Sequence, residues 1–167
     1  VTAARLFDLA VGDASSGPGA RAGSQACVAA SRHAPAEGNV GAGAGALVGK
    51  LFGLPRAMRG GIGTASVCVN GITVGALIAC NAVGDVINLA TGQVLAGART
   101  PDGRSLQNSR DAMLAGLAPQ SLLPGTNTTI GVIATDAILT KPQAHRLAQV
   151  AHDGLARTIN PVHTLLD

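Results

Sequence analysis

The sequence predicts an α+β domain, in which antiparallel strands and helices occupy separate parts of the molecule. Two observations carry this prediction. First, strand-like segments at 64–69 and 72–80 flank the dipeptide Asn70-Gly71, which is the strongest short-range signal for a β-hairpin. Second, a β-branched segment at 128–135 precedes a long stretch in which apolar residues recur at helical spacing.

The segment before the hairpin is expected to hold one strand, one helix and one loop. Residues 5–11 are apolar and predict a short strand, and residues 18–33 predict a helix because alanines recur there at helical spacing. The segment 37–45 is rich in glycine, a composition that disfavours regular helix or strand. We expect a loop there, in which backbone segments pack closely.

A second hairpin is expected after the first one, with its turn at Thr91-Gly92. Residues 100–125 are polar and interrupted by prolines and glycines, so they predict a long surface connection with one helical stretch near 111–117. The segment 128–135 predicts a buried strand.

The last element is predicted to be a single helix. Thr140 is a suitable N-cap, and Pro142 is tolerated in the first turn of a helix. Apolar residues then mark one helical face as far as Ile159. Asn160-Pro161 is expected to stop the helix, because the residue before a proline disfavours helical geometry.

The composition excludes several classes of function. The 167 residues include 13% charged residues, two Phe, and no Trp or Tyr, and the mean hydropathy is +0.34. This balance disfavours intrinsic disorder, and the scarcity of aromatic residues disfavours binding of single-stranded nucleic acid. The net charge of +3 is small and the arginines are scattered along the sequence, so no phosphate-binding face is expected.

The compartment is predicted from the hydropathy pattern and the cysteines. The most apolar run, residues 71–80, is well short of the roughly 18 residues that a membrane-spanning helix needs. Cys27, Cys68 and Cys80 are an odd number without a C-x-x-C pair, which is typical of reduced thiols. We therefore expect a cytoplasmic protein with no membrane or nucleic-acid partner.

The glycine-rich segment does not match a nucleotide-binding motif. A P-loop reads G-x-x-x-x-G-K-[ST], but Gly49-Lys50 has Ala44 at the first position and Leu51 after the lysine. The glycines before it alternate instead of following the G-x-G-x-x-G pattern of dinucleotide sites. By spacing alone, Lys50 is expected to be an exposed surface lysine.

The histidines and cysteines match no metal-binding pattern. His33, His145, His152 and His163 include no H-E-x-x-H motif, and the cysteine spacings fit no zinc site. His145 and His152 share a helical face, but surface or capping roles are the ordinary expectation for them. No metal and no other cofactor is expected.

Asn127-Thr128-Thr129 lies where a Pro/Gly segment meets the predicted strand, and three interpretations are open. The first is an ordinary junction between a loop and a strand. The second is a glycosylation sequon, against which the sequence shows no secretory signal. The third is a site of cleavage between Asn127 and Thr128. A threonine hydroxyl needs a base, and a free α-amine with a pKa of roughly 7.7–8.0 can accept its proton. Cleavage would therefore give Thr128 both nucleophile and base.

Several blocks of the sequence resemble one enzyme family. One block is 127–137, which is followed later in the chain by Pro161-Val162-His163-Thr164. Three more blocks lie upstream, at 37–43, 60–65 and 74–85. In them the chain resembles the N-terminal-nucleophile hydrolases of the D-aminopeptidase/β-aminopeptidase family, which includes the nylon-oligomer hydrolase (6-aminohexanoate-oligomer endohydrolase). The match runs in order from about Leu6 to Asp167.

The resemblance implies a role for individual residues. Thr128 matches the nucleophile that self-cleavage after Asn127 releases. Asn81 matches a side chain that stabilises the oxyanion, and Lys50 matches a lysine near the nucleophile in the nylon-hydrolase branch. Asp167 matches the first of two carboxylates that orient the amine of the nucleophile, and the second would lie just past it.

The resemblance also implies a fold, a substrate pocket and an assembly. The family fold is a four-layer αββα sandwich, whose precursor splits into two chains and commonly assembles as a homotetramer. Residues 1–127 would belong to the large chain and 128–167 to the small chain of one structural domain. Phe7 stands where the nylon-hydrolase branch has a tyrosine, which makes it a substrate-pocket candidate without the hydroxyl group. Family members are considerably longer, so the sequence is expected to be an internal part of such a protein.

The expected function is a self-processing amide hydrolase that acts through an acyl-enzyme. Its substrate would be the N-terminal residue of a peptide or β-peptide, a D-amino-acid amide, or a short polyamide. Two alternatives stay open: an acyltransferase of the ornithine-acetyltransferase type, which passes the acyl group to an amine, and a non-catalytic assembly domain. The blocks at Asn81 and 164–167 favour the hydrolase.

Overall fold

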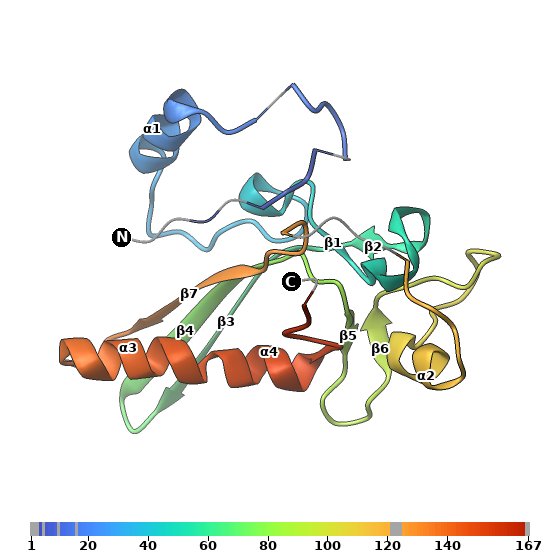
Figure 1. Ribbon diagram of the computed structural model, residues 1–167. Helices are drawn as coiled ribbons and strands as arrows, with labels where there is room; N and C mark the ends of the chain where they lie inside the picture. Colours follow the sequence, from blue (N-terminus) through green and yellow to red (C-terminus); the bar gives the residue numbers. More distant parts are fainter. Residues whose placement is uncertain (1–3, 5, 10, 16, 121–124, 166–167) are drawn as a thin grey trace.

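The computed structural model describes residues 4, 6–9, 11–15, 17–120 and 125–165, and these form a mixed α+β chain (Figure 1). The α-helices are α1 (Ala20–Val28), α2 (Ser109–Leu114), α3 (Lys141–Val150) and α4 (His152–Thr158). The strands are β1 (Leu47–Val48), β2 (Met58–Arg59), β3 (Gly61–Val69), β4 (Ile72–Cys80), β5 (Asp85–Ile87), β6 (Val94–Ala96), β7 (Ile130–Thr135) and β8 (Ile159–Asn160). The short 3₁₀ helices are η1 (Gly41–Gly43), η2 (Lys50–Phe52) and η3 (Leu54–Arg56).

The largest sheet has the strand order β3-β4-β7, and both pairings are antiparallel. The predicted hairpin is confirmed: β3 and β4 pair from Gly61–Cys80 to Val69–Ile72. Asn70 and Gly71 connect them with φ angles of 51° and 78°, the left-handed geometry that a two-residue turn of type I′ requires.

Strand β7 joins the other edge of β4, and its register positions the candidate site. Ile130 pairs with Ala79 at one end of the ladder and Thr135 pairs with Val74 at the other. Because the strands are antiparallel, the residue after β4 and the residue before β7 lie at the same end of the sheet. Those residues are Asn81 and Thr129.

A second sheet, β6-β5-β8, begins a few residues after β4 and contains the second predicted hairpin. Its strand β8 pairs with β5 through Asp85–Asn160 and Val86–Ile159. The segment 81–84 therefore links the two sheets. Buried apolar residues gather around it in two clusters, Leu51, Phe52, Val83 and Ala98 in one and Val48, Ala82 and Ile159 in the other.

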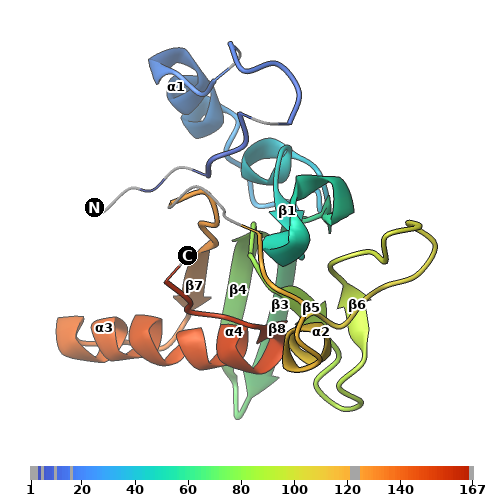
Figure 2. The same cartoon turned by 45° about the vertical axis from the view of Figure 1, so that its right-hand side comes forward.

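The last helical region consists of two helices, not of the single helix that the sequence predicts. Helices α3 and α4 are interrupted at Ala151 and follow nearly one line along one face of the β3-β4-β7 sheet (Figures 1 and 2). Gly154, a poor helix former, follows the break closely. The helix ends at Thr158, one residue earlier than predicted, because Ile159 takes extended geometry and pairs with Val86.

Two further expectations are corrected. Residues 6–9 and 11 form no strand; the amide of Val11 instead donates to the Asp8 carbonyl at 2.8 Å in a turn. Residues 5 and 10 of that predicted strand lie outside the described part of the chain. The strand predicted at 128–135 begins only at Ile130 and is not buried. Within the described chain β7 pairs with β4 alone, and Val132 is 63% exposed.

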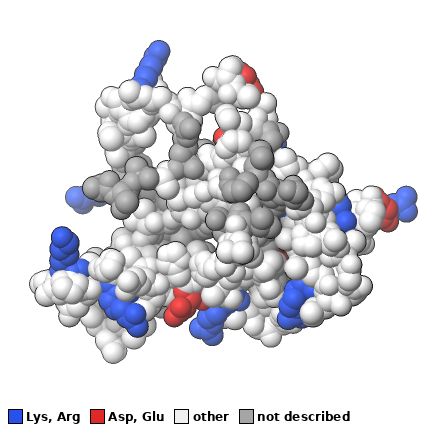
Figure 3. All heavy atoms as spheres, viewed as in Figure 1, with Lys and Arg blue, Asp and Glu red and all other residues white. Residues whose placement is uncertain are grey.

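The remaining helices agree with the sequence. Helix α1 lies within the predicted range 18–33, and α2 lies in the long connection at 100–125, close to its predicted position. Among the described residues, no helix combines the length and the apolar character that crossing a membrane would require. Lys and Arg residues are scattered over the face of the molecule that Figure 3 shows, and they form no basic patch there.

Candidate active site

Asn81 and Thr129 meet where the β3-β4-β7 sheet ends. The main-chain amide of Asn81 donates to Thr129 Oγ1 at 3.1 Å, a contact that the β4–β7 register sets up. The side chain of Asn81 is 1% exposed, so its polar atoms must be satisfied inside the protein. The end of the sheet thus holds a buried amide next to the segment that contains Thr128.

Lys50 is brought to the same place by a tight turn. Gly49 has a φ of +69°, and its amide and that of Lys50 donate to the carbonyls of Gly84 and Val83, both at 2.8 Å. A Cβ atom at Gly49 would lie 2.0 Å from the backbone nitrogen of Ala98. Glycine is therefore required at this turn by both its conformation and its surroundings.

The buried Lys50 ammonium binds three oxygen atoms. Its Nζ donates to Asn81 Oδ1 at 2.9 Å, to the Asn81 carbonyl at 3.2 Å and to the Thr126 carbonyl at 3.0 Å. Asn81 Oδ1 also accepts from the amide of Leu47 at 3.0 Å. Burial of a cation is costly unless hydrogen bonds replace its water shell, and these acceptors supply that replacement. The expectation of an exposed Lys50 is wrong: the side chain is 3% exposed.

The Thr126 carbonyl receives two side-chain donors. Lys50 Nζ donates at 3.0 Å and Asn81 Nδ2 at 3.1 Å. The segment that follows carries the buried Asn127 and the partly buried Thr128. Two preorganised donors in a dehydrated setting polarise whichever carbonyl they bind. The arrangement therefore fixes the chain just before Thr128 and provides donors suited to a carbonyl oxygen.

Thr128 lines a cavity of about 200 Å³. The cavity is bounded by the segment 127–129, by Ala82, by α4 and by the chain after β8. Most of its wall is apolar, but the imidazoles of His152 and His163 also face it. Such a small, mainly apolar cavity with a few polar groups is typical of a ligand site.

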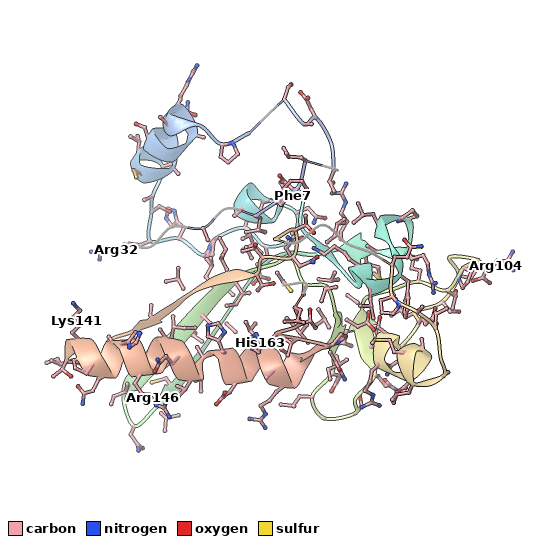
Figure 4. The ribbon with its side chains drawn as sticks, viewed as in Figure 1. Phe7, Arg32, Arg104, Lys141, Arg146 and His163 are labelled. Carbon is pink, nitrogen blue, oxygen red and sulfur yellow. The ribbon has the colours of Figure 1, made fainter. Side chains whose placement is uncertain are left out.

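The two histidines come from different elements and contact each other. Their ring centroids are 5.4 Å apart with a tilt of 42° between the ring planes. His152 begins α4, and His163 follows β8 and lies beside that helix (Figure 4). The sequence suggested a shared helical face for His145 and His152 instead, and no spacing in it indicates the His152–His163 pair. Among the described residues, no three metal-ligating side chains cluster.

The half-buried Cys80 and the buried Asp85 are two ionisable groups close to these residues in sequence. Burial raises the pKa of the Cys80 thiol, although hydrogen bonds with Ala82 and Thr129 and the charge of Lys50 act in the opposite direction. A raised pKa favours the thiol over the nucleophilic thiolate. Cys80 also does not line the cavity beside Thr128.

Asp85 is a structural carboxylate. Its Oδ1 accepts from the Ala98 amide at 2.8 Å and from Ser109 Oγ at 2.9 Å, and its Oδ2 accepts from the Ser109 amide at 2.7 Å. Burial raises the pKa of Asp85 despite these three hydrogen bonds, which lower it. The carboxylate connects β5 to the start of α2 and does not line the Thr128 cavity.

The structure thus brings together four of the six residues named from the sequence: Lys50, Asn81, Asn127 and Thr128. Phe7 is 37% exposed and does not line the Thr128 cavity. Asp167 lies outside the described residues. Sequence reasoning did not assign Thr129, whose hydroxyl binds the Asn81 amide; its position directly after Thr128 is the one signal that pointed to it.

Comparisons with known proteins identify a family and several relatives. The model of the Peptidase S58 family matches residues 2–167. An aminopeptidase of Mycobacterium leprae, described as uncharacterized, is 44% identical over 176 residues, which cover 100% of this chain and 46% of that protein. A similarly described aminopeptidase of Mycobacterium tuberculosis is 43% identical over 173 residues, covering 100% of this chain and 48% of that protein.

A more distant relative carries a more specific name. The beta-peptidyl aminopeptidase of Sphingosinicella microcystinivorans is 37% identical over 131 residues, which cover 73% of this chain and 30% of that protein. The chain spans about half the length of the two mycobacterial relatives. Because the family model matches almost every residue, from 2 to 167, the chain belongs to peptidase family S58.

Proposed function

We propose that this chain forms the nucleophile-bearing part of a self-processing amide hydrolase. Thr128 is the nucleophile, and cleavage of the Asn127–Thr128 bond releases its amine. One observation carries the proposal: Lys50 Nζ and Asn81 Nδ2 converge on the carbonyl of Thr126, next to the cavity that Thr128 lines. Membership of a peptidase family and relatives described as aminopeptidases support an amide-bond hydrolase.

Self-cleavage needs an attack of Thr128 Oγ on the carbonyl carbon of Asn127. The scissile C–N bond breaks, an ester forms, and the amine of Thr128 takes up the proton that the hydroxyl loses. Water then hydrolyses the ester, which leaves a carboxylate on Asn127 and a free hydroxyl on Thr128. The two hydrogen bonds to Thr126 support this step because they hold the chain before the scissile bond in one position.

The processed enzyme then uses the same groups on its substrate. The Thr128 amine accepts the hydroxyl proton, and Oγ attacks the substrate carbonyl. The tetrahedral oxyanion needs donors, and Asn81 Nδ2 with Lys50 Nζ can supply them once the chain ending at Asn127 moves away. The proton on the amine passes to the leaving amine, and water hydrolyses the acyl-enzyme. Asp167 would orient the Thr128 amine.

The remaining family properties belong to the same proposal. Residues 1–127 form part of the large chain and residues 128–167 part of the small chain, within a four-layer αββα sandwich that assembles as a homotetramer in the cytoplasm. The substrate is the N-terminal residue of a peptide, a β-peptide or a short polyamide. The name of the Sphingosinicella relative favours the first two.

Intact-mass measurement of the full-length protein tests the processing step. We expect two chains that meet at Asn127 and Thr128 in the unaltered protein and in Thr128→Ser, which keeps a hydroxyl group. Thr128→Ala should give one uncut chain and no hydrolysis of aminoacyl 4-nitroanilides. A single uncut mass for the unaltered protein, or the same cut in Thr128→Ala, would show that the proposal is wrong.

A second assay separates the two alternatives from the hydrolase. An acyltransferase would transfer the acyl group to an added amino acid faster than to water, so the N-acyl product would exceed the free acid. We expect free acid as the main product. A processed protein that neither hydrolyses nor transfers would favour the assembly domain.

A further inference from the structure

The cavity beside Thr128 has the size of one residue. Its volume is about 200 Å³, below the roughly 300–1,000 Å³ of cavities that hold drug-sized ligands. It adjoins a second cavity of about 590 Å³, with which it shares Thr129, His152 and Leu155. The space directly beside Thr128 suits one side chain. If Thr128 attacks an amide carbonyl, the group that enters this cavity is the acyl residue or its side chain.

Two imidazoles provide the titratable groups of this cavity wall. Of the nine residues that line it within the described chain, His152 and His163 are the ones that carry an ionisable side chain. Both are exposed to solvent, so a ligand can reach them. Their ring centroids are 5.4 Å apart, a spacing at which one small anion contacts both rings.

His163 has an unusual backbone. Its φ is +52°, in the left-handed region that few non-glycine residues adopt, with Asn, Asp and His the most frequent among them. Non-glycine residues with this geometry cluster at functional sites. Here the conformation accompanies a ring that faces both His152 and the cavity beside Thr128.

The charged side chains on the elements around the pair do not line the described part of the cavity. Behind the segment 126–128, the Lys50 ammonium binds the Thr126 carbonyl. Helix α4 carries Asp153 and Arg157, of which neither lines the cavity. Asp85, on the strand that pairs with β8, uses both of its oxygens for Ala98 and Ser109. No lining residue within the described chain is acidic.

We propose that the Thr128 cavity is the acyl-residue pocket and that His152 and His163 bind a carboxylate on that residue. The preferred substrates are thus amides whose acyl residue is acidic, of the aspartyl type. This inference rests on the proposed function, because it assumes that Thr128 attacks the carbonyl of that residue. Each imidazole carries a ring N–H group that can donate a hydrogen bond to a carboxylate oxygen.

The test compares two substrates that differ in one charge. Aspartyl and asparaginyl 4-nitroanilides are assayed in the α- or β-linked form that the unaltered full-length enzyme cleaves. The ratio of their kcat/KM values removes the titration of the Thr128 amine, which acts on both. We expect the unaltered enzyme to favour the aspartyl substrate about fivefold in kcat/KM at one fixed pH.

The variants show whether the histidines cause this preference. His163→Asn keeps a residue that tolerates the left-handed backbone, and His152→Asn removes the other ring. Both should process normally by intact mass, and in both the aspartyl-to-asparaginyl ratio should fall about fivefold, toward one. His145→Asn, on the exposed face of α3, is the control and should keep the full aspartyl preference.

Three outcomes overturn the inference. They are an unaltered enzyme that does not favour the aspartyl substrate, an unchanged aspartyl-to-asparaginyl ratio in both histidine variants, and cleavage of neutral substrates with none of the aspartyl one. Failure of the proposed function has a different appearance: no processing at Asn127–Thr128 and no cleavage of any amide. The two failures are therefore distinguishable.

Discussion

Lys50 shows how much a single residue depends on parts of the chain that are distant in sequence. Its Nζ contacts Asn81 and Thr126, which are 31 and 76 positions away. The sequence around it fits a surface lysine as well as a buried one, because nothing local supplies its hydrogen-bond acceptors. The family resemblance, and not the local pattern, placed it at the site. The fold then explains the placement through the turn at Gly49.

Asp85 leads to a prediction about stability and pH. Burial raises its pKa in the folded protein, so the folded state holds the proton more tightly than the unfolded state does. Stability is therefore greatest below the unfolded value of 3.8 and falls as the pH rises from there through the raised folded pKa. Above the folded pKa this loss of stability is complete. Between the unfolded and the folded pKa, the free energy of unfolding falls by at most about 1.4 kcal/mol per pH unit.

Urea denaturation of the unaltered protein and of Asp85→Asn between about pH 3.5 and about pH 7 measures this effect. The free energy of unfolding of Asp85→Asn minus that of the unaltered protein should increase as the pH rises, because the variant lacks the titration. Asp102→Asn is the control, since the Thr100 hydroxyl lowers the pKa of the exposed Asp102. The free energy of unfolding of Asp102→Asn minus that of the unaltered protein should therefore decrease as the pH rises. A difference for Asp85→Asn that falls with pH would contradict the prediction.

At the scale of elements, local signals predicted the hairpins and the helix starts. Asn70-Gly71 determined the β3–β4 turn, and the amide of Thr140 donates to Gln143 Oε1 at 2.8 Å as a cap of α3. The errors lie where long-range contacts decide the structure. The helix after Thr140 breaks at Ala151, and β7 is half-exposed because it lies at the edge of its sheet, which no local pattern reveals.

The β3–β4 turn gives a prediction for one element. Gly71 has a φ of +78° and open space around its Cα atom, so Gly71→Ala suffers from backbone strain and not from a clash. We expect a loss of about 1–2 kcal/mol in the free energy of unfolding, measured by urea denaturation. Gly63→Ala in β3 is the matched control: its surroundings are equally open and its φ is not positive.

The control should change stability by less than about 0.5 kcal/mol, as is usual for exposed positions without special geometry. Equal losses for both variants would mean that β propensity, and not the left-handed turn, limits the hairpin. Neither glycine lines the Thr128 cavity. Processing at Asn127–Thr128 should therefore continue in both variants.

At the scale of the molecule, the structure has two kinds of region. Residues 17–42, which include α1, are exposed throughout, and α1 stands apart from the sheets in both ribbon views (Figures 1 and 2). The buried clusters and the candidate site lie instead around the segment 46–52 and the segment 79–85. The sequence indicated the α+β class, and the family resemblance supplied the candidate site residues. Its expectations of burial were wrong at two places, since Lys50 is buried and β7 is partly exposed.

Limited digestion with trypsin tests this division. Arg32 lies in irregular, exposed chain just after α1, and Figure 4 shows it at the edge of the molecule. Arg56 is held in place: its Nε donates to the Arg99 carbonyl at 2.7 Å, and its guanidinium lies 5.0 Å from the centre of the Phe52 ring. A protease needs locally unfolded chain, so exposed segments with few contacts are cut first.

We therefore expect the first cut of the full-length protein within this chain after Arg32, with a cut after Arg56 only much later, as read by mass spectrometry of timed samples. Arg32→Gln should remove the early fragment, and the control Arg56→Gln should leave it unchanged. Because no residue of 17–42 lines the Thr128 cavity, the clipped protein should keep its hydrolytic rate. A first cut after Arg56, or loss of hydrolysis together with the cut after Arg32, would mean that the exposed segment supports the site.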